Sequence, residues 1–212
     1  HRAAGLDIRL GTRVVEAVDR VFRLSDGSEL AFDAVIAGVG VVPETDLAEA
    51  AGLAVSDGVL VDAVCRTSDP AIFAIGDVAR RSEDGSPGVR FESWQNANHQ
   101  ADRVAREIAG AVPSALEAPW VWSDQGDLNL QIAGRVSRDG QVVVRDHRVD
   151  DRGMTLLYFE AGRLIGGVTL DRGKDMALIR RALVGAEPVA ACTDFADIGQ
   201  PLRRLLSERA AV

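Results

Sequence analysis

A glycine and an aspartate, Gly76 and Asp77, directly follow a predicted apolar strand at residues 72–75. Glycine lets the backbone approach closely whatever lies at the end of the strand. The aspartate supplies a carboxylate that can accept hydrogen bonds from a sugar-like chain of hydroxyls. The pair predicts a ligand site at the carboxyl end of a strand, and the alternative is a plain β-turn followed by a helix cap.

A second candidate site is the start of a predicted helix over residues 92–111, where apolar side chains recur at spacings of three and four. Backbone N–H groups at a helix start, together with the helix dipole, favour an anion or an electron-rich carbonyl. A tryptophan at such a position could equally pack in the core. The first residues of this helix are Glu92, Ser93, Trp94 and Gln95, and its predicted buried face is Ala97, Ala101, Val104, Ala105 and Ile108.

The third candidate is a pair of glycines, Gly38 and Gly40, in the stretch Gly-Val-Gly-Val-Val-Pro. This stretch is not the GxGxxG phosphate loop, because Pro43 stands where a third small residue would open a helix. The glycines could line a ligand at a strand end or could simply allow close packing in a turn.

The other reactive side chains form no catalytic or metal-binding set. The histidines His1, His99 and His147 have no pairing with serine or cysteine motifs, and His99 is predicted to be a satisfied helix residue. Cys65 and Cys192 belong to no CxxC, so we expect buried free thiols. We therefore predict no catalytic side chain and no metal site.

Composition narrows the class of protein. The chain has 212 residues, of which 47% are hydrophobic, so it can bury the core of one large domain or two small ones. A net charge of −8 argues against a general nucleic-acid binder. The sequence has neither an apolar run near the ~18 residues that span a bilayer nor the apolar core of a secretory signal at its start. We expect a cytoplasmic protein.

The strands and helices predicted around the candidate residues indicate an α/β region followed by an α+β domain. Strands at residues 20–24 and 29–32 flank a hairpin turn at Asp26-Gly27-Ser28. A buried strand is predicted at residues 34–37, and another strand at residues 59–61. Residues 67–70, Thr-Ser-Asp-Pro, predict a turn.

The pattern changes after a proline-bearing linker at residues 111–119. Beyond it, strand-like runs separated by turns predict a C-terminal antiparallel sheet, with helices after it. The runs are residues 127–133, 141–147, 154–160 and 163–170, and the helices are residues 175–184 and 202–209.

Three motifs, in this order, carry a resemblance to a known family. They are TSDPAIFAIGDVAR at residues 67–80, ESWQNANHQA at residues 92–101 and PWVWSDQ at residues 119–125. Together they resemble the FAD-dependent, NADH-using ferredoxin reductases of bacterial oxygenase systems, a branch of the two-dinucleotide-domain flavoproteins. The resemblance covers nearly the whole chain but only the later half of such an enzyme.

The resemblance implies three domains and a partial enzyme. Residues 1–37 would end an NAD-binding domain, residues 38–115 would form the second segment of an FAD-binding domain, and residues 116–212 would form a C-terminal α+β reductase domain. The first strand and the phosphate loop of the NAD domain would precede His1. We therefore expect the longer protein to be the enzyme and this chain alone to lack turnover.

The same resemblance implies site residues for FAD and NADH. The Gly-Asp pair and the helix start would contact FAD, with Trp94 as an aromatic wall beside the isoalloxazine ring. Trp120 and Trp122 would lie near the cofactor edge, and the alternative is that both pack in the core. The flavin-binding residues would be Gly76, Asp77, Glu92, Ser93, Trp94, Gln95 and Trp122, and Gly38 and Gly40 would lie beside the nicotinamide of NADH.

The activity implied is the transfer of electrons from NADH through FAD to a [2Fe–2S] ferredoxin. Such a reaction needs no acid–base pair from the protein. Ferredoxins of this kind are commonly acidic, so Arg80, Arg81 and Arg90 are candidates for the docking face. The sequence does not discriminate NADH from NADPH, because the acidic residue that does so would precede His1.

Two other interpretations stay open. The chain could be a non-catalytic folded remnant whose exposed faces pair into a homodimer. It could also belong to a related NADH-dependent flavoprotein, such as a nitrite or rubredoxin reductase. PWVWSDQ argues against the disulfide reductases, whose terminal domain carries His-Glu pairs that are not evident here.

Overall fold

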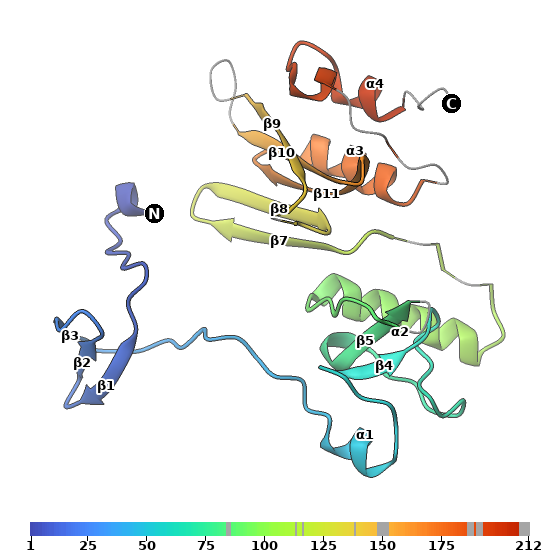
Figure 1. Cartoon of the computed structure of the whole chain (residues 1–212), viewed down its shortest axis with the longest axis horizontal. Helices are drawn as coiled ribbons and strands as arrows, with labels where there is room; N and C mark the ends of the chain where they lie inside the picture. The colour runs from blue at the N-terminus through green and yellow to red at the C-terminus, as the bar shows by residue number, and fades with distance from the viewer. Residues whose placement is uncertain are drawn as a thin grey trace. The chain divides into compact units, whose positions relative to one another are not determined.

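The computed structural model describes residues 1–83, 86–112, 114–115, 117–137, 139–147, 153–185, 189 and 193–207. Within them the chain forms two compact units, His1–Val41 (unit 1) and Val42–Val212 (unit 2), whose helices and strands are drawn in Figure 1. Cys192 and the end of the predicted helix at residues 202–209 lie outside the described residues.

Unit 1 is built on a three-stranded antiparallel meander in which β2 lies between β1 and β3. The predicted hairpin turn is confirmed, because Ser28 N donates to Asp26 Oδ1 at 2.9 Å between β2 and β3. The rings of Phe22 and Phe32 stack with centroids 4.3 Å apart. The elements are η1 (Arg2–Ala4), β1 (Val14–Val18), β2 (Val21–Leu24) and β3 (Glu29–Ala31).

The predicted buried strand at residues 34–37 is wrong. These residues have no regular structure, and Ile36 is 98% exposed. An apolar run becomes a buried strand only where neighbouring strands pair with it, and no strand described in unit 1 does so.

The first part of unit 2 is a small mixed sheet followed by a long helix. Strand β4 pairs in parallel with β5, and β5 pairs antiparallel with β6. The predicted strand at residues 59–61 is confirmed as β4. The elements are α1 (Asp46–Ala50), β4 (Val59–Val61), η2 (Gly76–Val78), β5 (Ala79–Glu83), β6 (Ser86–Pro87) and α2 (Trp94–Ile108).

The predicted strand at residues 72–75 is present only as a single bridge between Phe73 and Arg66. The segment facing it is bent, because Asp62 Oδ1 accepts hydrogen bonds from Val64 N and Arg66 N, each at 2.9 Å. A bent partner cannot extend the ladder. The predicted turn at residues 67–70 is confirmed and closes this short loop.

The predicted buried face of the helix at residues 92–111 is mostly exposed in α2. Ala101, Ala105 and Ile108 are exposed, whereas Ala97 and Val104 are half-buried. The loop beside the helix reaches it through polar bonds instead, such as the 2.7 Å ion pair between Arg66 and Glu107.

The last part of unit 2 is a five-stranded antiparallel sheet in the order β7-β8-β11-β10-β9. The four predicted strands are confirmed, and the structure adds a fifth, β7, which carries the tryptophan motif. Helix α3 packs against β11 and β8 (Figure 1), and α4 packs against α3. The elements are β7 (Trp120–Gln125), β8 (Leu128–Gly134), β9 (Gln141–Asp146), β10 (Met154–Glu160), β11 (Arg163–Leu170), α3 (Gly173–Leu183), η3 (Thr193–Ala196) and α4 (Leu202–Ser207).

The core against this sheet is formed by side chains that alternate between its two faces along each strand. Leu157 and Phe159 on β10 point to one face and meet Ile179 of α3 and Phe195 of η3, all of them almost fully buried. Each such side chain contributes about 1.5–3 kcal/mol relative to an exposed one. The sheet and α3 therefore form a rigid support for whatever β7 presents.

A buried arginine fastens the C-terminal segment to this sheet. Arg145 on β9 is only 2% exposed, and its guanidinium donates to Phe195 O at 2.7 Å, Asp197 O at 2.9 Å and Gln200 O at 2.7 Å. Burial lowers the pKa of Arg145 below its ordinary value. The carbonyl bonds offset part of the cost of burying this charge.

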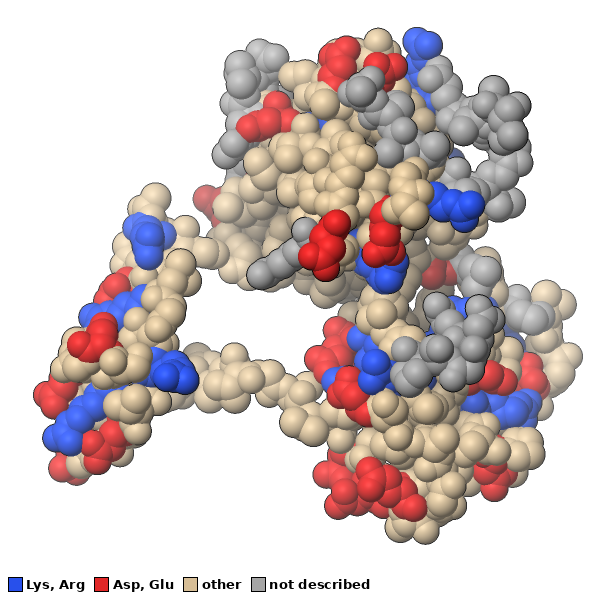
Figure 2. Space-filling model, viewed as in Figure 1, with Lys and Arg blue, Asp and Glu red and all other residues tan. Residues whose placement is uncertain are grey.

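The surface carries interspersed charges of both signs, as Figure 2 shows for one face. In unit 1, Arg23 pairs with Glu16 at 2.6 Å and with Glu29 at 3.1 Å. No helix in the described part of the chain is both long and apolar enough to cross a membrane.

Candidate functional site

Gly76 and Asp77 lie in the short helix η2, between the loop of residues 67–75 and strand β5. Gly76 N donates to Gln100 Oε1 of α2 at 2.6 Å, and its φ of +74° is a conformation that favours glycine. A Cβ built on Gly76 would lie 3.7 Å from Ala97 Cβ. That distance is an ordinary contact, so glycine is favoured here by its backbone conformation and not by lack of space. The carboxylate-bearing Asp77 is exposed.

Arg90 joins η2 to the residue that precedes the cap of α2. Its Nη1 donates to Asp77 O at 3.0 Å and also to the Glu92 carboxylate, and its Nε donates to Asp57 O at 3.1 Å. The Arg90 side chain is only 11% exposed. These bonds fix the Gly-Asp pair relative to the start of α2.

Two of the three arginines predicted for docking therefore have structural partners. Arg80 Nε donates to Gly88 O at 2.7 Å, and Arg80 Nη1 donates to Ser56 O at 2.9 Å. Arg90 is likewise bound to main-chain carbonyls. Both guanidinium groups hold loops in place, which leaves little of them for a partner protein.

The start of α2 has a side-chain cap and is exposed to solvent. Ser93 is the N-cap, and its Oγ accepts a hydrogen bond from Asn96 N at 3.2 Å. The N–H groups in the first turn of any helix have no partner within that helix, and the dipole gives this end a partial positive charge. Glu92 and Trp94, on either side of the cap, are exposed, and Gln95 is half-buried.

Trp94, Trp122 and Trp120 form a continuous tryptophan row from α2 to β7. Trp94 meets Trp122 edge to face with ring centroids 6.2 Å apart, and Trp122 stacks on Trp120 at 4.9 Å. The chain has three tryptophans, and all of them lie in this row. Trp94 is 70% exposed and Trp122 is 40% exposed, so two aromatic surfaces face solvent at the start of α2.

These residues combine the features that a flat aromatic ligand with carbonyls and a hydroxyl chain would need. The indoles offer stacking surfaces, the helix start offers N–H donors and Asp77 offers an acceptor for hydroxyls. The structure thus brings together the predicted residues of unit 2. They are Gly76, Asp77, Glu92, Ser93, Trp94, Gln95 and Trp122.

Gly38 and Gly40 lie in unit 1, in an irregular stretch. A Cβ on either glycine would meet nothing within 4 Å among the described residues, although the φ of +89° at Gly40 favours glycine there. Their contact with the nicotinamide stays a prediction.

The supporting roles of four residues were not predicted from the sequence, although Arg90 was named as a docking candidate. Gln100 holds Gly76, Arg90 bridges η2 and Glu92, and Glu117 and Arg180 reach the tryptophan row from the linker and α3. Gln100 falls within the ESWQNANHQA motif, which was a usable signal. The other contacts join distant residues and have no characteristic spacing.

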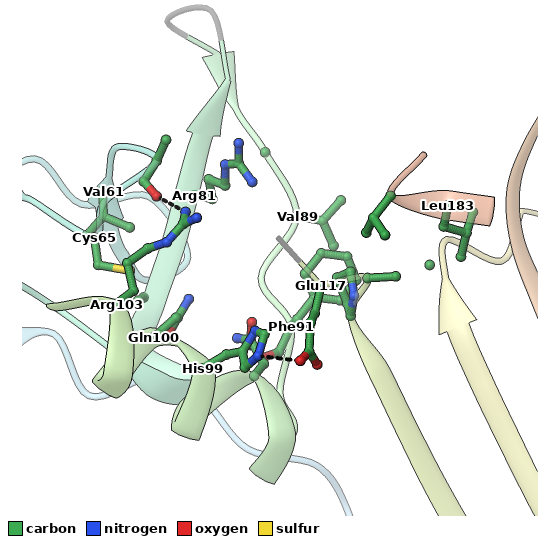
Figure 3. A pocket seen from close by; sticks show the side chains of 18 of the residues that line it. Val61, Cys65, Arg81, Val89, Phe91, His99, Gln100, Arg103, Glu117 and Leu183 are labelled. Carbon is green, nitrogen blue, oxygen red and sulfur yellow. Dashed lines mark hydrogen bonds and ion pairs between the residues drawn. The ribbon is translucent and has the colours of Figure 1, made fainter. Parts of the chain in front are cut away.

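A separate pocket of about 910 Å³ is lined by residues of α2, β5 and the linker before β7 (Figure 3). Cys65, His99, Gln100, Arg103 and Glu117 are among its lining residues, whereas the tryptophans are not. His99 Nε2 pairs with Glu117 Oε1 at 3.1 Å, and Arg103 donates to Ala63 O. His99 is therefore a satisfied helix residue, as predicted.

The one cysteine that lines the pocket among the described residues is not activated. Cys65 is buried, as predicted, and burial raises the pKa of its thiol, which keeps it protonated at neutral pH. No group of three or more His, Cys, Asp or Glu among the described residues is arranged to hold a metal ion.

Comparison with known families accounts for most of the chain. The family described as pyridine nucleotide-disulphide oxidoreductase matches residues 1–101, and the family described as reductase C-terminal matches residues 120–206. The predicted recognition is confirmed, and so is the fold class, α/β elements followed by a C-terminal antiparallel sheet with helices.

Curated relatives that match this chain are reductases by name. The chain is 41% identical to terpredoxin reductase from a Pseudomonas species over 192 residues, covering 86% of this chain and 46% of the relative. It is 34% identical to putidaredoxin reductase CamA from Pseudomonas putida over 216 residues, covering 98% of this chain and 50% of the relative. The chain thus spans about half the length of the curated relatives it matches.

Solved structures of the family have the same fold. The covalent putidaredoxin reductase–putidaredoxin complex matches with a TM-score of 0.88 at 33% identity, covering 100% of this chain and 52% of that chain. A ferredoxin reductase from Rhodopseudomonas palustris matches with a TM-score of 0.84 at 38% identity, covering 97% of this chain and 52% of that chain.

Proposed function

We propose that this chain belongs to an oxidoreductase that passes electrons from NADH through FAD to a [2Fe–2S] ferredoxin of an oxygenase system. The observation that carries the proposal is the exposed pair of Trp94 and Trp122 beside the open start of α2 and the Gly-Asp pair of η2. The names of the relatives, reductases of terpredoxin and putidaredoxin, favour a ferredoxin over nitrite as the acceptor.

The residues present fit a flavin. Trp94 and Trp122 would flank the isoalloxazine ring, and the N–H groups after Ser93 would face its electron-rich carbonyl edge. Asp77 would accept hydrogen bonds from the ribityl hydroxyls, and the positive φ of Gly76 sets the backbone turn that carries Asp77. Bound FAD would supply the hydride-accepting and single-electron chemistry that no side chain of this site offers.

The residues of this chain would bind, orient and shield the flavin. Arg90 fixes Asp77 and Glu92 with respect to each other, and Ser93 fixes the first turn of α2. No proton has to be moved by these groups, because electron transfer through a bound flavin needs no acid–base pair from the protein. Gly38 and Gly40 are proposed to approach the nicotinamide of NADH.

Turnover is proposed to need phosphate-binding segments beyond this chain. None of the 212 residues forms a GxGxxG loop, and the chain matches about half of each relative. We retain residues 1–37, 38–115 and 116–212 as the proposed NAD, FAD and C-terminal segments. Location in the cytoplasm and docking of a ferredoxin near the tryptophan row belong to the same proposal.

The test is a visible spectrum of the purified chain after incubation with FAD and gel filtration. Flavin bands that elute with the protein would support a flavin pocket built by this chain, and added NADH should then leave those bands unbleached. FAD that elutes entirely as free ligand would contradict a pocket in this chain, and rapid bleaching would contradict the need for further segments.

A further inference from the structure

A polar cluster behind the tryptophan row joins three segments that are far apart in the sequence. Glu117, in the linker before β7, pairs through Oε1 with His99 of α2 at 3.1 Å and through Oε2 with Arg180 of α3 at 3.2 Å. Gln95, in the first turn of α2, donates to the same carboxylate at 3.5 Å. One carboxylate therefore ties the flavin-facing helix to the helix that supports the sheet.

Arg180 connects this carboxylate to the tryptophans. Its guanidinium carbon lies 4.3 Å from the centroid of the Trp120 ring, within the range of a cation–π contact. Arg180 Nε is buried and has no hydrogen-bond partner among the described residues, which fits a guanidinium laid flat on a ring face. Trp120 is also held through its indole N–H, because Nε1 donates to Gln131 Oε1 of β8 at 3.1 Å.

The contacts continue from Trp120 to the solvent-facing end of the row. Trp122 stacks on Trp120 with an interplanar angle of 28° and meets Trp94 at an angle of 87°. Trp122 is 40% exposed, so one side of its ring depends on Trp120 for support. The orientation of the exposed indole is thus set by a chain of contacts that begins at Glu117.

We propose that Arg180 and Glu117 are positioning residues that fix the tryptophan row, so that Trp122 and Trp94 present a preformed surface to the flavin. The proposal rests on the proposed function for the identity of the ligand, but the fixing of the row is a property of the chain itself. A surface ion pair alone contributes little. Here the pair is joined to a ring contact and to a second helix, which gives the arginine one preferred orientation.

The row provides its own spectroscopic signal, because it contains every tryptophan of the chain. Two stacked indoles couple their ultraviolet transitions and give paired circular dichroism bands of opposite sign. We expect this couplet in the wild-type chain without any cofactor. Its assignment to the stacked pair is checked by Trp120→Phe, which should abolish it.

The variants separate positioning from general stability. Arg180→Met and Glu117→Gln should each lose most of the couplet amplitude and should raise the accessibility of tryptophan fluorescence to acrylamide. Arg180→Lys keeps the charge but not the planar face, so it should retain an intermediate amplitude. The matched control is Arg181→Met, the exposed neighbour on α3, which should leave the couplet unchanged.

An unchanged couplet in both Arg180→Met and Glu117→Gln would overturn the proposal, as would the absence of a couplet in the wild type. If Arg180→Met does not fold, judged by its thermal melt, Glu117→Gln and Arg180→Lys decide in the same way. Retention of FAD is measured separately on the same proteins. Loss of the couplet in the variants, with no flavin binding by the variants or the wild type, would support the positioning role of Arg180 and Glu117 and contradict the flavin site.

Discussion

The indole of Trp94, the first residue of α2, meets the ring of Trp122 on β7 with 6.2 Å between centroids and an angle of 87° between planes. This contact joins the helix start to the C-terminal sheet. Because Trp94 is still 70% exposed while it makes the contact, most of its surface remains available to a ligand.

Replacing Trp94 should weaken flavin binding without unfolding the chain. We expect Trp94→Ala to raise the Kd for FAD roughly 2- to 10-fold, the equivalent of losing one aromatic contact of about 0.5–1.5 kcal/mol. The matched control is Ile108→Ala, since Ile108 is 71% exposed on the same helix. Equal effects of the two substitutions in a titration of flavin absorbance would contradict the stacking role.

Gly76 should tolerate no side chain without a loss of binding. Its φ of +74° makes Gly76→Ala cost about 1–2 kcal/mol of stability. Gly126→Ala, at a φ of +64° with open space around it, should lose a similar amount. Only Gly76→Ala should also weaken FAD binding, because only Gly76 lies against α2. Urea unfolding and flavin titration of both variants measure the two effects.

Arg90 is predicted to hold η2 in place relative to the start of α2. Arg90→Met removes the bonds to Asp77 O, Asp57 O and Glu92, so η2 should become mobile relative to α2. We expect faster amide exchange in η2 and weaker flavin binding. Arg106→Met, which breaks an exposed pair with Asp102 on α2, is the control. Unchanged exchange in η2 would refute the bridge.

Arg145 should be among the most sensitive positions of the C-terminal sheet. Arg145→Met leaves the carbonyls of Phe195, Asp197 and Gln200 without their donor and should lower the free energy of unfolding by about 2–5 kcal/mol. Arg163→Met, on the exposed end of β11, should change it by less than about 0.5 kcal/mol. Urea titrations followed by far-ultraviolet circular dichroism decide between these outcomes.

The Cys65 thiol should react slowly in the folded chain. Burial raises its pKa, so its thiolate fraction at about pH 8 lies below that of a free cysteine, whose pKa is about 8.5. The difference in dithionitrobenzoate reaction between wild type and Cys65→Ser isolates this thiol. The reaction of the Cys65 thiol obtained from this difference should be slow in buffer and fast in guanidinium chloride. A fast difference in buffer would show an accessible thiol.

The C-terminal sheet was largely predictable because its pattern is local. Leu157 and Phe159 alternate with less buried residues along β10, so the burial of one face is written in the sequence. Strand β7 was missed because Trp120–Gln125 carries polar residues and was considered only as a motif. The prediction of a strand around Ile36 was wrong for the opposite reason. This stretch has the apolar composition of a buried strand, but no described strand pairs with it.

The candidate site was predictable only in part. Gly76, Asp77 and the start of α2 were found because a strand end and a helix cap have local signatures. The contacts of Glu117 with His99 and Arg180 depend on how the linker passes between α2 and α3, which no spacing encodes. Local chemistry could thus be predicted from the sequence, whereas its support could not.

The most direct test of the central claim, that the tryptophan row faces a flavin, is a titration of the chain with FAD followed by tryptophan emission. A flavin bound at Trp94 and Trp122 should give quenching that saturates and exceeds the quenching of free N-acetyltryptophanamide at the same FAD concentrations. Quenching that rises linearly and equals that of the free indole would mean that no flavin binds at Trp94 and Trp122.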